Sequence, residues 1–444
     1  MTVIEDARGV IDAGPVCDAC LGRCFADRSF GLTNGERGKA LRVTAALEDD
    51  EEYDPVSPEE CWVCEGRSGE FDEWAERVAE AVEGLHFETY QVGTRTPPLI
   101  EENERLLREE AGLDDTADEV ESPTQTDDAG ERFKSEFNRE VGKRVGELTD
   151  TMVDFNRPDV LALLNLEREG DVEIQVNPAF VYGRYRKLER DIPQTEWPCR
   201  ECGGSGKQLG DAGEEPCDYC GGSGYLYDES VEELVAPHVR KAMDGEEAVF
   251  HGAGREDVDA RMIERGRPFV VEVKEPGFRS PDVDELEAAI NDAAEGSVEV
   301  TDLALATHGM VERVKELDAS KTYRMDVEFA EPVSAEELDG ALDDLDGATI
   351  EQYTPERVDH RRASVTRTRQ VYDIEGSLED DTRATIELHG EGGLYVKELV
   401  SGDNGRTEPS LADLLGVDAE VTALDVVDVQ GEDEPFDDPE YLRE

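Results

Sequence analysis

The sequence predicts an α+β fold, in which helices and strands are mixed rather than strictly alternating. Apolar residues recur every three to four positions in some segments and at every second position in others, which indicates both helices and strands. These segments do not follow one another as regular β-α-β units, which argues against a doubly wound parallel sheet. With 444 residues the chain is long enough for about three domains.

The N-terminal half is expected to contain amphipathic helices and short strands. Trp74, Val78 and Val82 recur at helical spacing, and Val172, Ile174 and Val176 alternate with polar residues as in a strand. The expected helices lie near 74–85 and 133–148, the expected strands near 87–93 and 172–176, and an acidic loop or linker covers 112–130.

The C-terminal half carries the longest block of regular structure, from about residue 228 to residue 430. The last dozen residues are acidic and are expected to be frayed. Within the block, helices are expected near 229–243 and 283–294, and strands near 268–273, 323–329, 383–389 and 393–397.

Acidic residues are in large excess along the whole chain. There are 111 Asp and Glu against 45 Lys and Arg, a formal net charge of -66. High charge with few aromatic residues is also typical of disorder, but the recurring apolar periodicity argues for a folded protein. We therefore expect a protein from the high-salt cytoplasm of a halophile, where the screening length is about 3 Å at 1 M salt. The overall charge would conceal a nucleic-acid site rather than reveal one.

The sequence gives no indication of a membrane partner. No apolar run approaches the ~18 residues that a membrane span needs. The N-terminal residues 1–6 lack the basic and apolar pattern of a signal peptide. A soluble cytoplasmic protein is therefore expected.

The second of two cysteine groups has the spacing of a structural zinc site. It consists of two C-x-x-C-G-G-S-G segments, and C-x-x-C places two thiolates on one tight turn. Glycines after each pair allow positive φ, so that backbone N–H groups can face the sulfurs. Four thiolates would complete the tetrahedral shell of Zn²⁺ and leave no position for a substrate. The expected ligands are Cys199, Cys202, Cys217 and Cys220.

The first cysteine group predicts another zinc site, with a long insertion between its two pairs. It contains five cysteines, and Cys24 is left over if the two C-x-x-C pairs bind one ion. The alternative is a partial site in which Cys24 replaces one ligand. The expected ligands are Cys17, Cys20, Cys61 and Cys64, so two structural Zn²⁺ ions are expected in total.

One loop motif carries the functional prediction. Residues 254–261 read G-R-E-D-V-D-A-R, and 266–269 read G-R-P-F. The first string resembles the G-R-x-D loop of pseudouridine synthases, and the two together resemble the archaeal and eukaryotic tRNA pseudouridine synthases that act in the T-loop. Further segments similar to that family lie at 177–187, 321–324, 354–362 and 393–400.

The resemblance implies a mixed-sheet pseudouridine synthase domain preceded by a zinc-containing, THUMP-like module that binds RNA. It also implies that uridine 54, uridine 55 or both are isomerised without a cofactor. The implied division is a zinc-binding region (1–68), a THUMP-like domain (69–197), a zinc knuckle (198–226), a catalytic domain (227–430) and an acidic tail (431–444).

The resemblance also assigns roles in the site. Asp257 would be the nucleophile, Lys397 the cation that keeps it ionised, and Tyr323 the ring that stacks on the flipped uracil. Lys397 stands where many superfamily members have Arg, and Glu256 replaces a common Thr, so the role of Glu256 stays open.

The partner implied is tRNA, held at the T-loop and the acceptor end. Two segments rich in basic residues, 182–190 and 354–369, are predicted to contact phosphate. The doubled cysteine knuckle resembles that of DnaJ-type chaperones, so the alternative is a non-catalytic, zinc-bearing RNA-binding protein or RNA chaperone. The predicted substrate-binding residues are Tyr323, Tyr395, Arg255, Arg361, Arg362, Arg184, Arg186 and Lys187.

Overall fold

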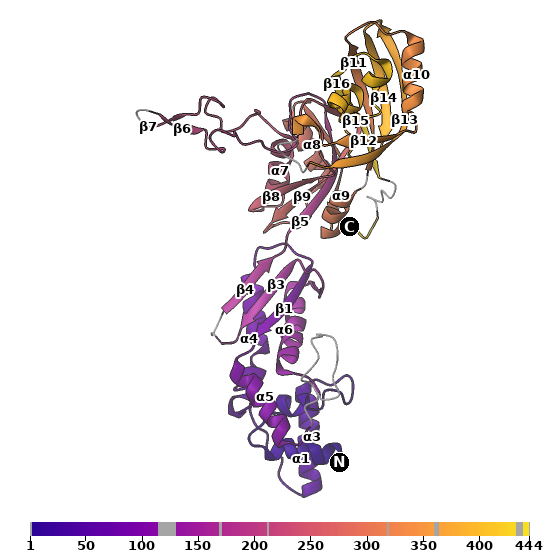
Figure 1. Cartoon of the computed structure of the whole chain (residues 1–444). Coiled ribbons are helices and arrows are strands. Elements are labelled where there is room, and N and C mark those ends of the chain that lie inside the picture. Colours follow the sequence, from indigo (N-terminus) through magenta and orange to yellow (C-terminus); the bar gives the residue numbers. More distant parts are fainter. Residues whose placement is uncertain are drawn as a thin grey trace. The chain divides into compact units, whose positions relative to one another are not determined.

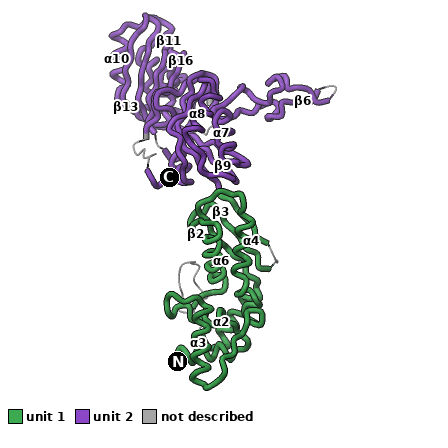
Figure 2. Tube along the Cα trace, turned by 180° about the vertical axis from the view of Figure 1, so that it is seen from behind, with its two compact units in different colours: residues 1–177 green, residues 178–444 purple. Residues whose placement is uncertain are grey.

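The computed structural model divides the chain into two compact units, Met1–Asn177 and Pro178–Glu444 (Figure 2). It describes residues 2–113, 130–167, 171–210, 213–317, 319–358, 364–431 and 438–443. No helix within these ranges is both long enough and apolar enough to cross a membrane. Most of the expected linker at 112–130 lies outside the described residues.

The first unit packs helices against a small mixed sheet (Figure 1). Its strands are β1 (Thr89–Arg95), β2 (Met152–Val153), β3 (Val160–Asn165) and β4 (Asp171–Val176), in the order β2-β1-β3-β4. β1 is parallel to β2 and β3, whereas β4 is antiparallel to β3. The helices are α1 (Val3–Asp12), α2 (Asp18–Arg23), α3 (Asn34–Asp49), α4 (Phe71–Ala81), α5 (Pro98–Glu110) and α6 (Phe133–Thr149), with 3₁₀ turns η1 (Pro58–Glu60) and η2 (Arg67–Gly69).

The apolar periodicity of the first unit explains its packing. α4 buries Trp74 and Val78, and α6 buries Phe137 and Val141, which contribute to one core. The Trp74 and Phe137 rings meet edge to face at 6.5 Å between centroids. The helices expected near 74–85 and 133–148 and the strands expected near 87–93 and 172–176 are confirmed, with small shifts of their ends.

The second unit contains a ten-stranded mixed sheet. Its path is β10-β5-β9-β16-β11-β14-β13-β12-β15, and β8 pairs with β9. The strands are β5 (Ala179–Lys187), β8 (Glu247–Gly252), β9 (Arg261–Lys274), β10 (Val298–Ala306), β11 (Ala319–Phe329), β12 (Thr349–Tyr353), β13 (Thr366–Asp380), β14 (Arg383–Gly390), β15 (Thr407–Glu408) and β16 (Ala419–Gly431). A separate hairpin of β6 (Lys207–Gly210) and β7 (Gly213–Pro216) extends from this unit (Figure 1).

Helices cover the large sheet and close its core. α7 packs on β8 and β9, α8 on β10, α10 on β13, and α11 on β16. The bounds are α7 (Val231–Ala242), α8 (Val283–Ala293), α9 (His308–Glu316), α10 (Ala335–Leu345), α11 (Val396–Ser401) and α12 (Leu411–Leu415), with η3 (Glu356–Val358) and η4 (Gly402–Gly405). Helices and mixed sheets in both units confirm the expected α+β class.

Three features of the second unit differ from the expectation. The strand expected near 393–397 is a turn, in which Gly393 adopts φ +84°, followed by α11 from Val396. β5 belongs to the large sheet rather than to the expected domain 69–197, since it pairs with both β9 and β10. Near the end of the expected frayed tail, Tyr441 and Leu442 pack against the cluster around Phe180 and Met310.

Candidate active site

The loop between β8 and β9 carries Asp257 at the middle of the large sheet. β9 meets β16 in parallel only at Arg261 and Met262, directly after this loop. Gly254 enters the loop with φ +75°, and a Cβ there would lie 3.3 Å from Nη1 of Arg267. Glycine therefore provides both the left-handed conformation and the close approach of Arg267. The Asp257 side chain keeps 34% of its surface exposed, so a substrate can reach its carboxylate.

Two cations hold the Asp257 carboxylate from opposite oxygens. Nη1 of Arg357 donates to Oδ1 at 3.1 Å, and Nζ of Lys397 lies 3.4 Å from Oδ2. Lys397 is closer to Asp259, with Nζ–O distances of 2.8 and 3.0 Å. Lys397 stands in the first turn of α11. The structure thus brings together Asp257 and Lys397, as the sequence predicts, and adds Arg357 and Asp259.

Arg357 is itself fixed by a buried carboxylate. Its Nε donates to Oε1 of Glu398 at 2.6 Å, and the Glu398 side chain is only 6% exposed. Burial by itself would lower the pKa of Arg357. The hydrogen bonds and charges of Glu398 and Asp257 outweigh this effect and raise the pKa above its ordinary value, so the guanidinium stays charged. The sequence predicted no role at Asp257 for Arg357 or Glu398, although Arg357 lies in a family-like segment. The residues are 100 or more positions from Asp257, and spacing alone cannot pair them.

Tyr323 and Tyr395 lie in different surroundings. Tyr323 is 7% exposed on β11 and belongs to the main core. Burial, and more weakly the charge of Asp257, raise the pKa of Tyr323 to about 12 despite the opposing effect of Arg267. Its phenol is therefore neutral at physiological pH. Tyr395 precedes α11 and is half-buried, and its backbone exchanges two hydrogen bonds of 2.9 Å with the Gln352 amide.

The structure buries two of the four basic residues of 182–190, Arg184 and Lys187, whereas Arg186 and Arg190 are partly exposed. Lys187 is completely buried, and Arg184 is 6% exposed and donates to the carbonyls of Arg265, Gly266 and Val429. Arg186 pairs with Glu299. The prediction of a phosphate-binding surface at Arg184 and Lys187 is corrected, because β5 lies between two neighbouring strands and its side chains are almost all buried.

The other arginines predicted to bind RNA lie on the Asp257 loop and in the segment 354–369. Arg255 is exposed on the Asp257 loop. Arg361 and Arg362 lie outside the described residues. Of the remaining arginines in 354–369, Arg357 contacts Asp257 and Arg369 lies 3.2 Å from Glu391.

Both predicted cysteine groups are assembled. In each, all four sulfur atoms lie within 4.8 Å of one another, and the closest sulfur pairs are 3.5 to 3.9 Å apart. A tetrahedron with metal–sulfur distances of about 2.3 Å has edges of about 3.8 Å. The two groups can therefore each hold one metal ion. Cys24 is buried outside the first group, and its thiol donates to the carbonyl of Cys20.

The glycines of the second group have the expected function. Gly206 and Gly224 donate their N–H groups to the sulfurs of Cys202 and Cys220 at 3.3 and 3.2 Å. Both have positive φ, and a Cβ on either would lie within 2.5 Å of a carbonyl oxygen on the opposite knuckle. Any larger residue would separate the two knuckles.

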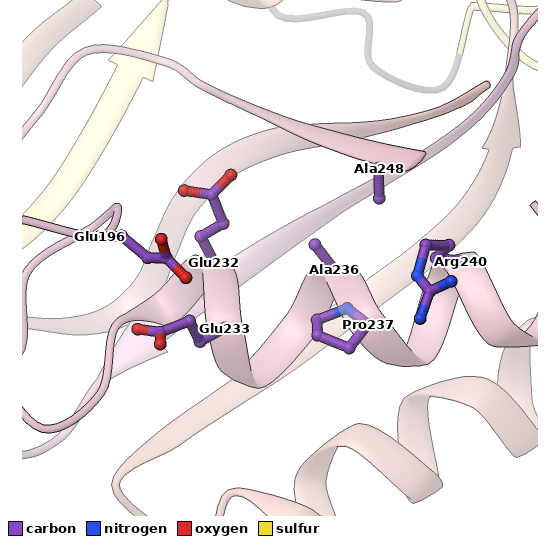
Figure 3. A pocket seen from close by; sticks show the side chains of 7 residues that line it. All are labelled: Glu196, Glu232, Glu233, Ala236, Pro237, Arg240 and Ala248. Carbon is purple, nitrogen blue, oxygen red and sulfur yellow. The ribbon is translucent and has the colours of Figure 1, made fainter. Parts of the chain in front are cut away.

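A surface pocket on α7 and β8 is distinct from this site (Figure 3). Its described lining includes none of Asp257, Tyr323 and Lys397. Three glutamates face it against one arginine, which disfavours phosphate. The lining residues are Glu196, Glu232, Glu233, Ala236, Pro237, Arg240 and Ala248.

Comparison with known proteins places this arrangement in a family. The family model described as "Pus10, C-terminal" matches residues 180–430, and "Pus10 THUMP domain, archaeal" matches 74–165. The protein named tRNA pseudouridine synthase Pus10 of Halorubrum lacusprofundi is 65% identical over 444 residues, 100% of both chains. Its namesake in Methanothrix thermoacetophila is 42% identical over 97% of this chain and 95% of its own. The chain belongs to the Pus10 family.

Proposed function

We propose that the chain is a tRNA pseudouridine synthase that isomerises uridine 54, uridine 55 or both in the T-loop. The observation that carries the proposal is the partly exposed Asp257 carboxylate between Arg357 and Lys397. Two cations favour the ionised form of a carboxylate, and only this form is nucleophilic. The names of the relatives, tRNA pseudouridine synthase Pus10, support the same activity.

In the proposed reaction, Asp257 attacks either the uracil base or C1′ of the ribose. The C1′–N1 bond breaks, the uracil turns, and a bond forms between C1′ and C5. The bond between Asp257 and the substrate also breaks, which returns the free carboxylate. The proton leaves C5 and N1 regains one, so the reaction is an isomerisation that needs no cofactor. The target base must leave the stack to reach the loop. The ring of Tyr323 is the proposed wall against which the uracil lies.

The proposed partner is tRNA, with the T-loop at the second unit and the acceptor end at the THUMP-containing first unit. Arg255 is an exposed candidate for phosphate contact, and Tyr395, Arg361 and Arg362 are further candidates from the sequence. The proposed metal in both cysteine groups is Zn²⁺, because four thiolates in a tetrahedral arrangement are its typical structural shell. The ions would hold the chain together and take no part in the chemistry. The proposed site of action is the cytoplasm.

The test is an incubation of the purified protein with an unmodified tRNA transcript. Pseudouridine is then mapped by carbodiimide-dependent stops in primer extension. We expect stops at position 54, position 55 or both, and none with Asp257→Asn, which retains tRNA binding. Asp259→Asn is the matched control and should retain measurable turnover. Binding of tRNA without any pseudouridine would favour the non-catalytic RNA-binding alternative.

Residual turnover of Asp257→Asn within about tenfold of wild type, ~1.4 kcal/mol in barrier height, would contradict the assignment of the nucleophile. The mapped position decides between uridines 54 and 55.

A further inference from the structure

We infer that Glu256 is a positioning residue, which holds the Asp257 loop through a buried cluster formed by Tyr185, Lys187 and Arg267. This inference rests on the proposed role of Asp257 as the nucleophile. Glu256 and Asp257 are consecutive, but their side chains have opposite environments. The Glu256 side chain is 1% exposed, whereas that of Asp257 is 34% exposed. A buried carboxylate is costly unless cations and hydrogen-bond donors pair with it.

Three side chains surround the Glu256 carboxylate. Oε2 lies 2.8 Å from Nε of Arg267, and Oε1 lies 3.8 Å from Nζ of Lys187. The Tyr185 hydroxyl lies 2.8 and 3.0 Å from the two oxygens, and it accepts a hydrogen bond from the Gln194 amide at 2.9 Å. Since its oxygen accepts from Gln194, the Tyr185 hydroxyl is oriented to donate to Glu256.

The same side chains hold the backbone of the loop on both sides of Glu256. Before it, Arg267 donates to the carbonyl of Ala253 at 2.7 Å, and Gln194 donates to that of Gly254 at 3.0 Å. After it, Lys187 donates to the carbonyls of Asp257 at 3.2 Å and Val258 at 3.0 Å. The cluster therefore fixes the backbone at Asp257 itself.

The charge of Glu256 is what keeps two cations buried beneath the loop. Arg267 and Lys187 are both completely buried, and two unbalanced cations there would carry a high desolvation cost. Burial raises the pKa of Glu256, but the charges of Arg267 and Lys187 bring it below its ordinary value. Glu256 is thus an anion at physiological pH. Without its charge, Lys187 and Arg267 repel each other and release the loop carbonyls.

The experiment compares Glu256→Gln with wild type in single-turnover kinetics and tRNA binding on the full chain. We expect the rate of the chemical step to fall at least tenfold while the Kd for tRNA stays within threefold, because the surface of the loop is unchanged. Glu256→Asp keeps the charge but is shorter, and should recover at least threefold of the loss. Tyr185→Phe keeps every charge and should give a smaller loss of rate with unchanged Kd. If Glu256→Gln does not fold, Tyr185→Phe takes its place in the test.

The control for a merely structural effect is Leu342→Ala in α10, which leaves a cavity in the core on β13 without touching the loop. It should lower the melting temperature and keep the wild-type rate at a temperature where both variants are folded. A wild-type rate for folded Glu256→Gln, or an equal loss of rate in Leu342→Ala, would overturn the inference. Asp257→Asn runs in parallel: if it remains active, the assignment of Asp257 as the nucleophile fails instead, and if wild type forms no pseudouridine, the proposed function fails.

Discussion

At the scale of single residues, the site depends on how carboxylates are paired. Asp257 is accessible and contacts two cations, Asp259 shares one of them, and Glu398 fixes the other. Burial raises the pKa of Asp259, but hydrogen bonds from Lys397 lower it, so Asp259 competes with Asp257 for this lysine. Arg357 donates hydrogen bonds to Asp257 and to the buried Glu398, which fixes its guanidinium.

Arg357→Gln is therefore expected to lower the rate of the chemical step at least tenfold, about 1.4 kcal/mol in barrier height. The reason is that the variant removes one counter-ion of Asp257 and leaves Glu398 buried without its partner. Arg357→Lys should have a rate between those of wild type and Arg357→Gln. Lysine keeps the positive charge but lacks the planar guanidinium with which arginine contacts both carboxylates. Rates are measured in single turnover with saturating enzyme. Unchanged rates in both variants would show that Lys397 alone is sufficient.

At the scale of elements, the two parts of the large sheet are joined where β9 meets β16. The parallel ladder there is short, with Asp425 opposite Arg261 and Val426 opposite Met262. Asp425 strengthens the junction, since it lies 2.7 Å from Nη2 of Arg190 and accepts from Nε of Arg261 at 2.9 Å. The Asp257 loop ends at the same place, so the junction also supports the site.

Asp425→Asn is expected to destabilise the second unit by about 1–3 kcal/mol near neutral pH, typical of hydrogen bonds to charged groups. Burial raises the pKa of Asp425, but Arg261 and Arg190 lower it below its ordinary value. Its folded pKa is thus below the unfolded value of about 3.9. The stabilisation is complete above about pH 3.9 and is lost as pH falls through the folded pKa.

Melting temperatures of wild type and Asp425→Asn, measured at pH 7 and at pH 3, check this prediction. The difference between the two proteins should be large at pH 7 and should shrink at pH 3. A difference that is the same at both values would show that the charge of Asp425 does not stabilise the junction.

The two cysteine groups are local elements whose metal content can be counted. We expect two zinc ions per chain by elemental analysis of protein purified without added metal. Cys217→Ala with Cys220→Ala should remove one ion, and Cys17→Ala with Cys20→Ala should remove the other. Cys24→Ser should leave the count at two, because the Cys24 thiol lies outside the first group. A count of one in Cys24→Ser would instead make Cys24 a ligand.

At the scale of the whole molecule, the net charge of -66 sets the conditions under which the chain is stable. The Debye length is about 8 Å at 0.15 M salt and about 3 Å at 1 M. At 0.15 M salt, surface carboxylates therefore repel one another across a distance of several residues. At 1 M salt, only carboxylates that are near neighbours repel one another. The ion pair between Glu256 and Arg267 is screened much less, because both side chains are buried.

We predict that the melting temperature in 2 M KCl is higher than in 0.15 M KCl, because salt relieves the repulsion of the surface charge. Thermal unfolding followed by circular dichroism at both concentrations measures the effect. KCl at constant pH is compared with an equal osmolality of sucrose, which does not screen charge. If sucrose gives the same increase, relief of surface repulsion is not its cause.

The sequence by itself determined the features that depend on neighbours along the chain. The two cysteine groups with their glycine turns and the helices of regular periodicity follow from local spacing, and the loop motif around Asp257 was identified by its resemblance to a family. The geometry of a C-x-x-C turn depends on the residues of the turn itself, and the glycines that follow each pair allow the positive φ that the turn needs. Lys397 was assigned from the same family resemblance and not from its spacing.

Only the tertiary structure decided which charges face solvent and which distant residues meet. Arg184 and Lys187 form a basic segment in the sequence, yet β5 runs between β9 and β10 and carries both side chains into the interior. Arg357 and Glu398 reach the Asp257 loop from 100 or more positions away. The physical reason is that a charged side chain has no sequence periodicity of its own. Its role as a surface contact or a buried counter-ion depends on the partner that the fold places beside it.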